Sequence, residues 1–387
     1  MRPLRIRRSR RLLRGHLWVF SNELASSPRG FEPGQLVELQ DLRGRFLAVG
    51  YVNPHSLISA RVLSRQREDI GKEFFLRRIV QAQALRAALP LERGSYRLIY
   101  SEADMLPGLV VDIYQEVVVA QLNTAGMEAL KPLVLEALQE ALRPKALVLR
   151  ADSRARTLEG LPLYAEVAAG TLEGPVEITE GGLRLLVEPL RGQKTGFFLD
   201  QRFNRLALGR FLPLGGRGMD LFTYTGAWAL QAAHQGAEEV LAVDTSGTAL
   251  ELARDNAALN GLSQKVRFEQ ADALEALQAE APESLDFIVA DPPSLIRSAA
   301  HLKEGQRLYR RLNALCMSRL KRGGLLATSS CSWHMHRELF LQSLHEAARE
   351  AGRTTRLLWQ GGQGPDHPVL LAMPETEYLK CFFLRVD

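Results

Sequence analysis

The sequence predicts a doubly wound α/β domain in the second half of the chain, preceded by a small β-barrel and a central α+β module. Within residues 217–329, strand-like runs alternate with helical patterns, as in a parallel sheet with crossover helices. Within residues 17–65, short β-rich runs are separated by Gly and Pro turn signals, which is typical of a barrel. The length of 387 residues allows two or three domains. We expect these domains at 1–68, 69–180 and 181–387.

The first two domains are expected to contain short strands and two helices. An amphipathic helix at 71–89 places apolar side chains on one face and stops at Pro90. A second helix is expected at 126–142. The apolar face of the first helix comprises Phe74, Phe75, Ile79, Ala82 and Leu85. The expected strands are 17–20, 35–40, 46–51 and 58–63 in the barrel, and 96–101, 108–113, 117–123 and 146–150 in the central module.

The last domain opens with a hairpin that turns at Gly181-Gly182. Parallel strands are then expected at 217–222, 239–243, 266–270, 285–290 and 325–329, with a helix after each of the first four. Further strand-like runs near 355–359, 368–372 and 379–386 lack full crossover helices. They therefore predict an antiparallel edge at the end of the sheet.

Positive charge is concentrated at the start of the chain. Residues 1–70 carry a net charge of +7, with 13 Arg and 6 acids, whereas the remaining 317 residues carry −2. The first 14 residues hold seven arginines and no acid: Arg2, Arg5, Arg7, Arg8, Arg10, Arg11 and Arg14. A small basic module of this kind predicts contact with a nucleic-acid backbone, because the guanidinium fork pairs with phosphate. The alternative is a solvated Arg-rich surface, since Arg outnumbers Lys 41 to 8 in the whole chain.

Several classes of protein are disfavoured by composition. No apolar run approaches the ~18 residues that a membrane span needs, and no apolar signal-peptide segment follows the basic N-terminus. Three widely spaced cysteines exclude a disulfide scaffold and argue against a structural zinc site. We therefore expect a cytoplasmic protein with no membrane association and no metal.

Four acidic residues follow or end successive strands of the last domain. The first strand runs into Asp220-Leu221-Phe222-Thr223-Tyr224-Thr225-Gly226, a tight turn before a helix. Asp244, the pair Asp272-Ala273 and Asp291-Pro292-Pro293-Ser294 mark the next three strand ends. Doubly wound folds bind nucleotides at this edge, although the sequence has neither a G-x-G-x-x-G nor a P-loop. A single such Asp is more often a helix cap or turn former, but four in order favour a binding site.

These motifs resemble motifs I to IV of class I S-adenosylmethionine-dependent methyltransferases. The segment Gln193–Arg202 resembles motif X, and Gly15–Glu23 and Ser329–Ser332 extend the resemblance over nearly the whole chain. The chain is identified as a member of the PUA-domain-containing 23S rRNA cytosine-5 methyltransferases. This resemblance implies a PUA β-barrel that binds RNA, a central α+β domain and a Rossmann-like methyltransferase domain with a mostly parallel seven-stranded sheet.

The resemblance also implies a cofactor, S-adenosyl-L-methionine, and a set of residues that hold it. The residues that it implies as cofactor-binding are Asp220, Phe222, Thr223, Tyr224, Gly226, Asp244, Asp272, Ala273, Asp291 and, from motif X, Lys194, Phe198, Gln201 and Arg202. The implied partner is 23S rRNA, free or in a large-subunit precursor. A homodimer is plausible, and the sequence leaves the oligomeric state open.

Cys331 and Asp291 are the implied catalytic residues. Cys331 follows the fifth strand and Asp291 the fourth, and these strands are neighbours in the doubly wound order. A thiolate that adds to carbon 6 of cytosine makes carbon 5 nucleophilic toward a methyl sulfonium, and Asp291 could assist at ring nitrogen 3. Position 294, where related enzymes carry a second cysteine, is a serine, so the base for the carbon 5 proton stays unassigned. Cys316 and Cys381 are expected to be core residues.

Two other functions remain open at this point. One is methylation of an exocyclic nitrogen of adenine or guanine. The absence of an aromatic residue at Ser294 and Leu295 counts against it. The other is an RNA-binding assembly factor without catalysis, which the intact acidic residues and Cys331 disfavour.

Overall fold

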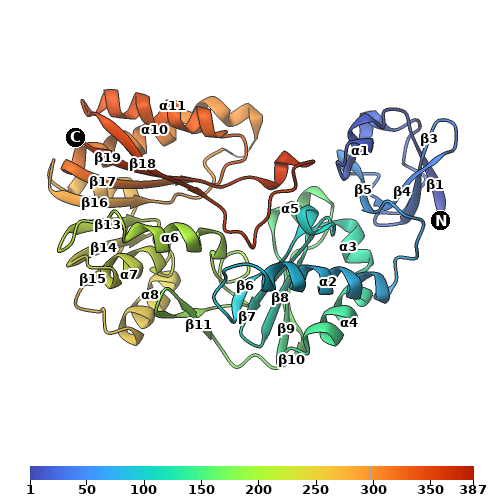
Figure 1. The fold of residues 1–387 in the computed structure, drawn as a ribbon, viewed down its shortest axis with the longest axis horizontal. Coiled ribbons are helices and arrows are strands. Elements are labelled where there is room, and N and C mark those ends of the chain that lie inside the picture. Colours follow the sequence, from blue (N-terminus) through green and yellow to red (C-terminus); the bar gives the residue numbers. More distant parts are fainter. Residues whose placement is uncertain (297) are drawn as a thin grey trace. The chain divides into compact units, whose positions relative to one another are not determined.

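The protein folds into two compact units (Figure 1), seen in a computed structural model that describes residues 1–296 and 298–387. The N-terminal unit comprises Met1–Ile178, Val187–Leu199 and Pro365–Thr376. The C-terminal unit comprises Thr179–Leu186, Asp200–Gly364 and Glu377–Asp387. The chain therefore passes between the units more than once, and each unit is described separately below.

The N-terminal unit begins with a five-stranded sheet in the order β1-β3-β4-β5-β2. Its elements are β1 (Arg2–Ile6), α1 (Arg10–Leu13), β2 (Trp18–Phe20), β3 (Leu36–Asp41), β4 (Phe46–Val52) and β5 (Ile58–Ser64). The four expected strands are confirmed, but β1 and α1 were not predicted. In both elements arginines alternate with the apolar residues that pack inward, namely Leu4, Ile6 and Leu12, so the apolar signal is weak. The basic segment is thus part of a folded sheet rather than a free arm.

A second five-stranded sheet, in the order β10-β9-β8-β7-β6, forms the centre of this unit. Its strands are β6 (Ser95–Tyr100), β7 (Leu109–Tyr114), β8 (Val117–Leu122), β9 (Ala146–Ala151) and β10 (Tyr164–Gly170), and its helices are α2 (Lys72–Ala87), α3 (Ala125–Ala129), α4 (Lys131–Leu142) and α5 (Arg154–Leu158). The predicted helix at 126–142 is two helices, since the chain leaves helical geometry at Leu130, two residues before Pro132. Leu85 on α2 is exposed, so it does not belong to the buried face as predicted.

The C-terminal unit contains a seven-stranded sheet in the order β15-β14-β13-β16-β17-β19-β18. Its strands are β13 (Arg217–Leu221), β14 (Glu239–Asp244), β15 (Val266–Gln270), β16 (Leu285–Ala290), β17 (Leu320–Ser330), β18 (Thr355–Gly362) and β19 (Lys380–Val386), and a hairpin of β11 (Val176–Glu180) and β12 (Leu183–Val187) precedes them. The first five strands of this order are parallel, and β19 is antiparallel to both of its neighbours. The doubly wound fold and its antiparallel end are confirmed.

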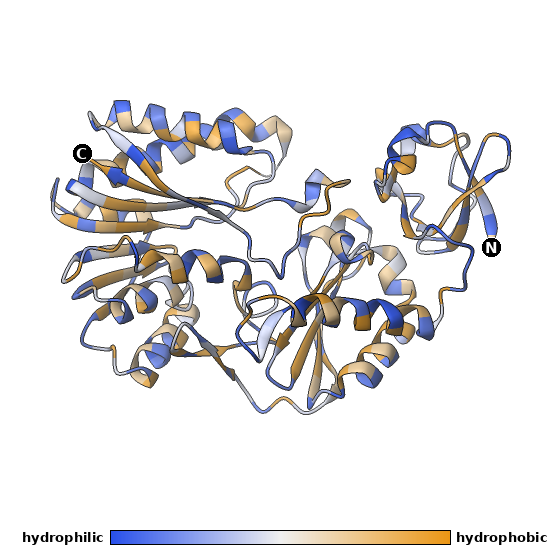
Figure 2. Cartoon of the chain, in the orientation of Figure 1, coloured by the Kyte–Doolittle hydropathy of each residue, from blue (hydrophilic) through white to orange (hydrophobic). Residues whose placement is uncertain are grey.

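Helices cover both faces of this sheet (Figure 1). They are α6 (Arg202–Leu208), α7 (Ala227–His234) and α8 (Gly247–Leu259), which pack on one another, and α9 (Ala273–Ala279), α10 (Leu302–Arg319) and α11 (Arg337–Glu350), which form the second group. The strands are mostly hydrophobic in Figure 2, whereas the helices carry both colours, because the sheet is buried on two faces and each helix on one.

The end of the chain differs from the prediction in two places. A full crossover helix, α11, connects β17 to β18, and its buried Phe340, Leu344 and Ala348 follow helical spacing. The run 368–372 is not a strand. It belongs to the segment Pro365–Thr376, which returns to the N-terminal unit.

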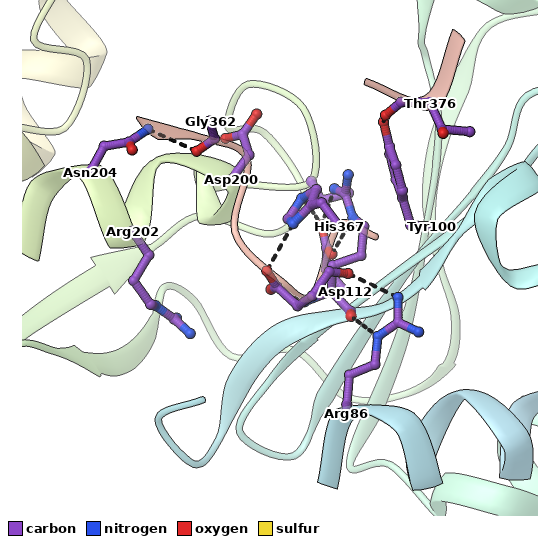
Figure 3. A network of polar contacts seen from close by, with 12 residues as sticks. Arg86, Tyr100, Asp112, Asp200, Arg202, Asn204, Gly362, His367 and Thr376 are labelled. Atoms are coloured by element: carbon purple, nitrogen blue, oxygen red, sulfur yellow. Dashed lines mark hydrogen bonds and ion pairs between the residues drawn. The ribbon is translucent and has the colours of Figure 1, made fainter. Parts of the chain in front are cut away.

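Segment 365–376 is held in the N-terminal unit by polar contacts (Figure 3). The main-chain oxygen of Asp366 accepts a hydrogen bond from Arg86 at 2.8 Å, and its carboxylate accepts one from the main-chain N–H of Arg97 at 3.0 Å. The Tyr100 hydroxyl donates to the Thr376 carbonyl at 2.9 Å. These groups are buried or partly buried, so the segment is fixed by specific hydrogen bonds instead of sheet pairing.

No helix in the described part of the chain is both long enough and apolar enough to cross a membrane.

Candidate active site

The predicted acidic residues lie at the carboxyl ends of the parallel strands in the C-terminal unit. Asp220 is the second-to-last residue of β13, Asp244 ends β14, and Asp291 directly follows β16. In the register of the sheet, Asp220 lies beside Ala242 on one neighbour and Val289 on the other. The strand order therefore brings these carboxylates to one edge, as the sequence predicted.

Asp220 is fully buried, and its surroundings oppose ionisation. One carboxylate oxygen accepts hydrogen bonds from the Thr223 hydroxyl and from the main-chain N–H of Ala229, the latter at 3.0 Å. Burial, followed by the charges of Asp291 and Asp244, raises the pKa of Asp220 to about 7. The second oxygen, Oδ1, is buried without a hydrogen-bond partner among the described residues. An acceptor of this kind leaves one hydrogen bond that a bound ligand can make.

The loop after β13 has a strained backbone. Phe222 and Tyr224 adopt left-handed conformations, with φ of 63° and 54°, and Gly226 follows with φ of 83° at the start of α7. Left-handed backbone is costly for residues other than glycine, and such residues cluster at binding sites. The main-chain N–H of Tyr224 donates to Asp244 at 2.9 Å, so this loop is tied to the next strand.

Asp244 and Asp272 are both engaged by the backbone. Asp244 accepts from Ser246 N–H at 2.9 Å in addition to Tyr224, and it stays half-buried. Asp272 is exposed and caps α9, accepting from the N–H groups of Leu274 and Glu275. Ala273 beside it is buried. Asp272 therefore fills the helix-cap role that was weighed against ligand binding, and its cofactor contact stays a prediction.

Asp291 is half-buried and contacts α7, the helix that follows β13. One of its carboxylate oxygens accepts a hydrogen bond from the indole N–H of Trp228 on α7 at 3.1 Å. Trp228 was not predicted as a site residue. Its indole N–H is a polar group at the start of an otherwise apolar helix, and this could have indicated its role.

Cys331 directly follows β17 and is half-buried, whereas Cys316 and Cys381 are fully buried. Burial raises the pKa values of the Cys316 and Cys381 thiols, which confirms them as core residues with inert thiols. Cys331 is the one cysteine of the three that is accessible at the edge where the carboxylates gather.

A group of hydroxyls lies next to Cys331. Tyr309 of α10 contacts the hydroxyls of Ser330 and Ser332 at 2.9 and 3.1 Å, and Ser294 contacts Ser332 at 3.0 Å. Burial and the nearby charge of Cys331 raise the pKa of Tyr309 to about 12. Ser294, the position that lacks a second cysteine, is therefore engaged with the same loop as Cys331.

Two further residues near Cys331 were missed in the sequence. Lys380 is the first residue of β19 and lies opposite Ser330 in the sheet register. The ring of Trp333 is 39% exposed and is contacted edge-on by His334 and His336. Trp333 could have been predicted as a site residue, because it lies two residues after Cys331 in the sequence. Lys380 could not, because only the antiparallel pairing of β19 with β17 brings it to the site.

The predicted motif X residues fall in both units. Arg202 is fully buried and pairs with Glu180, which also binds Arg205. Gln201 is buried, and its side-chain oxygen accepts from Asn204 at 2.5 Å. The Asn204 amide also donates to Gly362 (Figure 3), so these residues tie α6 to β18. In the N-terminal unit, the Lys194 ammonium lies 4.2 Å from the centre of the Phe198 ring. Cofactor contact by these four residues stays a prediction.

The seven N-terminal arginines are all exposed. Arg2 donates to the Gly30 carbonyl and lies over Phe31, while Arg11 contacts His16 and Glu375. Arg7 makes a 3.5 Å contact with the Asn22 carbonyl. The remaining four, Arg5, Arg8, Arg10 and Arg14, make no side-chain contact within the described part of the chain.

Comparison with known proteins decides the family. A family model described as a PUA-like domain matches residues 4–65, and one described as an S-adenosylmethionine-dependent methyltransferase matches residues 101–366. The chain is 40% identical to ribosomal RNA large subunit methyltransferase I of Erwinia tasmaniensis, over 98% of this chain and 97% of that protein. The chain belongs to this methyltransferase family. The protein of the same name from Klebsiella pneumoniae is 39% identical, with 98% and 96% of the two chains covered.

Solved structures of other proteins share the fold. A protein from Streptococcus mutans assigned to the S-adenosylmethionine-dependent methyltransferases superposes with a TM-score of 0.85, at 20% identity and full coverage of both chains. A methyltransferase structure complexed with SAH gives the same values. The cofactor of the family is S-adenosylmethionine.

The residues at the strand ends fit this cofactor. Asp220 supplies a buried acceptor oxygen, Oδ1, that has no partner among the described residues, and the loop 222–226 has three residues with left-handed backbone. Asp244 ends the second strand, where an acid can accept from ribose hydroxyls. A Cβ atom at Gly226 would lie 3.1 Å from Phe268, so this turn has little room for a side chain.

Proposed function

We propose that this methyltransferase forms 5-methylcytidine in 23S rRNA, with Cys331 as the nucleophile and Asp291 as its assistant. The observation that carries the proposal is the position of Cys331, an accessible thiol at the end of β17. The paired strands β16 and β17 lead directly to Asp291 and Cys331, because Ala290 lies opposite Thr328 in the register.

The reaction needs a covalent intermediate, because carbon 5 of cytosine is a weak nucleophile. The Cys331 thiolate adds to carbon 6, and the electron pair of the carbon 5–carbon 6 double bond then becomes available at carbon 5. S-adenosylmethionine, when bound, supplies a methyl group on a positively charged sulfur. As carbon 5 bonds this methyl group, the methyl–sulfonium bond would break and leave S-adenosylhomocysteine. Loss of the carbon 5 proton to water then restores the ring double bond as the bond between carbon 6 and the Cys331 sulfur breaks and the thiolate leaves. Asp291, held by Trp228, is suited to share a proton with ring nitrogen 3, because its protonated form donates a hydrogen bond to that nitrogen.

The RNA substrate is supported by the N-terminal unit and by the relatives. The matched PUA-like domain carries six of the seven exposed arginines, all but Arg2, and the relatives are named for the large-subunit ribosomal RNA. The target base has to leave its stack to reach a thiol at a strand end. Free 23S rRNA or a large-subunit precursor is therefore the favoured substrate. The exposed Trp333 ring next to Cys331 offers a surface on which a base can stack.

The proposal is tested by incubating the protein with tritiated S-adenosylmethionine and unmodified 23S rRNA, followed by digestion to nucleosides. We expect label in 5-methylcytidine, no label with Cys331→Ala, and a stable adduct between the wild-type protein and RNA that contains 5-fluorocytidine. Cys316→Ala is the matched control, because that thiol is buried in the core, and it should keep both activities.

Other outcomes would point to the alternatives. Label in a methylated adenosine or guanosine would keep the fold and cofactor but remove the catalytic role of Cys331. Cofactor binding without transfer to any RNA would favour an assembly factor. Full activity of Cys331→Ala would contradict the covalent mechanism.

A further inference from the structure

Lys380 lies at the edge of the sheet that carries Cys331. It begins β19, the antiparallel strand, whose amino end therefore meets the carboxyl end of β17. In the register Lys380 lies opposite Ser330, the residue before Cys331. The topology thus brings a cation to the edge of the sheet where the other named groups are carboxylates.

The ammonium group of Lys380 is fixed by the backbone around the thiol. Its Nζ atom donates to the carbonyl of Ser332 at 2.7 Å and to the carbonyl of Tyr378 at 2.8 Å. Ser332 follows Cys331 directly, so the first bond holds the lysine to the loop that carries the thiol. An ammonium has three N–H donors, and these two carbonyls use two of them.

We propose that Lys380 is a positioning residue that stabilises Cys331 as a thiolate ready to attack. The proposal rests on the proposed function, because only a nucleophilic thiol needs such help. Thiolate formation releases the thiol proton to water, and the ammonium remains as the counter-ion of the sulfur. An opposite charge next to an ionisable group favours its charged form.

The electrostatics of the site agree with this placement. Burial lowers the pKa of Lys380 to about 8, while the negative charges of Cys331 and Glu377 act in the opposite direction. The interaction is mutual, so a cation that is stabilised by a thiolate also stabilises that thiolate. Other titratable groups on the neighbouring elements are Asp291, which follows β16, Tyr309 of α10, and the histidines of the loop after Cys331, His334 and His336.

The test measures the ionisation of Cys331 in the protein without RNA. The rate of alkylation of the Cys331 peptide by iodoacetamide is followed by mass spectrometry between pH 5 and 10. Lys380→Gln keeps N–H donors for the two carbonyls but removes the charge, and it should move the midpoint upward by about one pH unit. Lys380→Arg keeps the charge and should stay near the wild-type midpoint. Lys321→Gln, at the opposite end of β17, is the matched control and should cause no shift.

An unchanged midpoint in folded Lys380→Gln would overturn the proposal and would indicate a structural role for the lysine. A second measurement does not depend on the folding of that variant. The chain has eight lysines, so selective isotope labelling allows the titration of Lys380 to be followed by NMR. Cys331→Ser should lower the pKa of Lys380, and equal values in both proteins would also reject the proposal.

Failure of this inference is distinguishable from failure of the proposed function. The alkylation and NMR experiments use neither RNA nor methyl transfer. If Cys331→Ala kept methyl transfer while Lys380→Gln still shifted the alkylation midpoint, the coupling would be real and the nucleophile assignment wrong. If only the shift were absent, Cys331 would remain the nucleophile without this assistance.

Discussion

Asp220 combines full burial with a carboxylate whose Oδ1 has no partner among residues 1–296 and 298–387. Its pKa, raised to about 7 chiefly by burial, lies well above that of an unfolded aspartate near 4. The folded state therefore binds more protons than the unfolded state between these values. By linkage, this residue makes the protein less stable as the pH rises from about 4 to 7. A buried aspartate that lowers the stability of the protein in this way favours a role for Asp220 in binding.

Asp220→Asn should remove this pH-dependent penalty. The amide keeps an acceptor for Ala229 N–H and carries no charge at any pH. We expect the variant to gain stability relative to the wild-type protein at pH 8, on the order of a few kcal/mol, and to gain little at pH 4. Urea unfolding at both pH values measures the difference. Equal gains at both pH values would show that Asp220 does not take up its proton between about pH 4 and 7. The variant should also bind S-adenosylmethionine more weakly.

The loop 222–226 has a strained backbone and belongs to the proposed cofactor site. Three of its residues have positive φ, and its Gly226 leads directly into α7. A side chain at position 226 meets two problems, the left-handed backbone and the approach of Phe268 at 3.1 Å. The left-handed backbone at Gly226 is thus set by the loop 222–226 as a whole rather than by a single contact.

Gly226→Ala should lower both stability and cofactor affinity. Gly261→Ala is the matched control, because Gly261 also has a positive φ of 66° but has no atom within 4 Å of the added Cβ. Both variants should lose about 1–2 kcal/mol from the left-handed backbone. Only Gly226→Ala should also weaken S-adenosylmethionine binding, by about tenfold (~1.4 kcal/mol), as measured by calorimetry. Wild-type affinity in Gly226→Ala would show that the loop is not part of the cofactor site.

The parallel strands were predictable from the sequence because they alternate with helices. β14 and β16 are mostly apolar runs, whereas β13 and β15 contain charged residues and were recognised from their place in this alternation. The order of the strands also gave the positions of Asp220, Asp244 and Asp291. Strand β1 was missed because arginines alternate with its core residues, and β10 because it is a largely exposed edge strand. Lys380 could not be assigned to the site, since its position depends on β19 inserting between β17 and β18. That insertion is a property of the whole sheet and not of any local pattern.

At the scale of the molecule, charge is divided between parts of the chain with different tasks. The first 70 residues carry +7, and the remaining 317 carry −2. Four of the arginines in this segment lie on β1 and α1, two elements whose apolar residues are buried in the first core; they are Arg2, Arg5, Arg10 and Arg11. The basic surface is therefore held in a fixed arrangement, which favours repeated phosphate contacts over loose attraction.

Reversing the charge of three arginines should separate RNA binding from cofactor binding. Arg5, Arg8 and Arg10 are suitable, because they are exposed and make no side-chain contact with the described residues, unlike Arg2 and Arg11. The triple change to Glu should weaken binding of 23S rRNA fragments at least about tenfold at 0.1 M salt and reduce the salt slope by about 2–3, since each phosphate contact adds about one. S-adenosylmethionine affinity should not change.

A control variant with the same change in net charge decides whether the position of the charge matters. Arg254, Arg322 and Arg349 are exposed residues of the C-terminal unit and are changed to Glu together. If binding to RNA is local to the N-terminal segment, this variant should lose affinity less than threefold, because charges that do not contact the RNA are screened over about 10 Å at 0.1 M salt. Equal losses in the two triple variants would mean that overall charge, rather than the arginines of β1 and α1, attracts the RNA. Filter binding across 50–300 mM salt distinguishes these outcomes, since only a local contact changes the slope as well as the affinity.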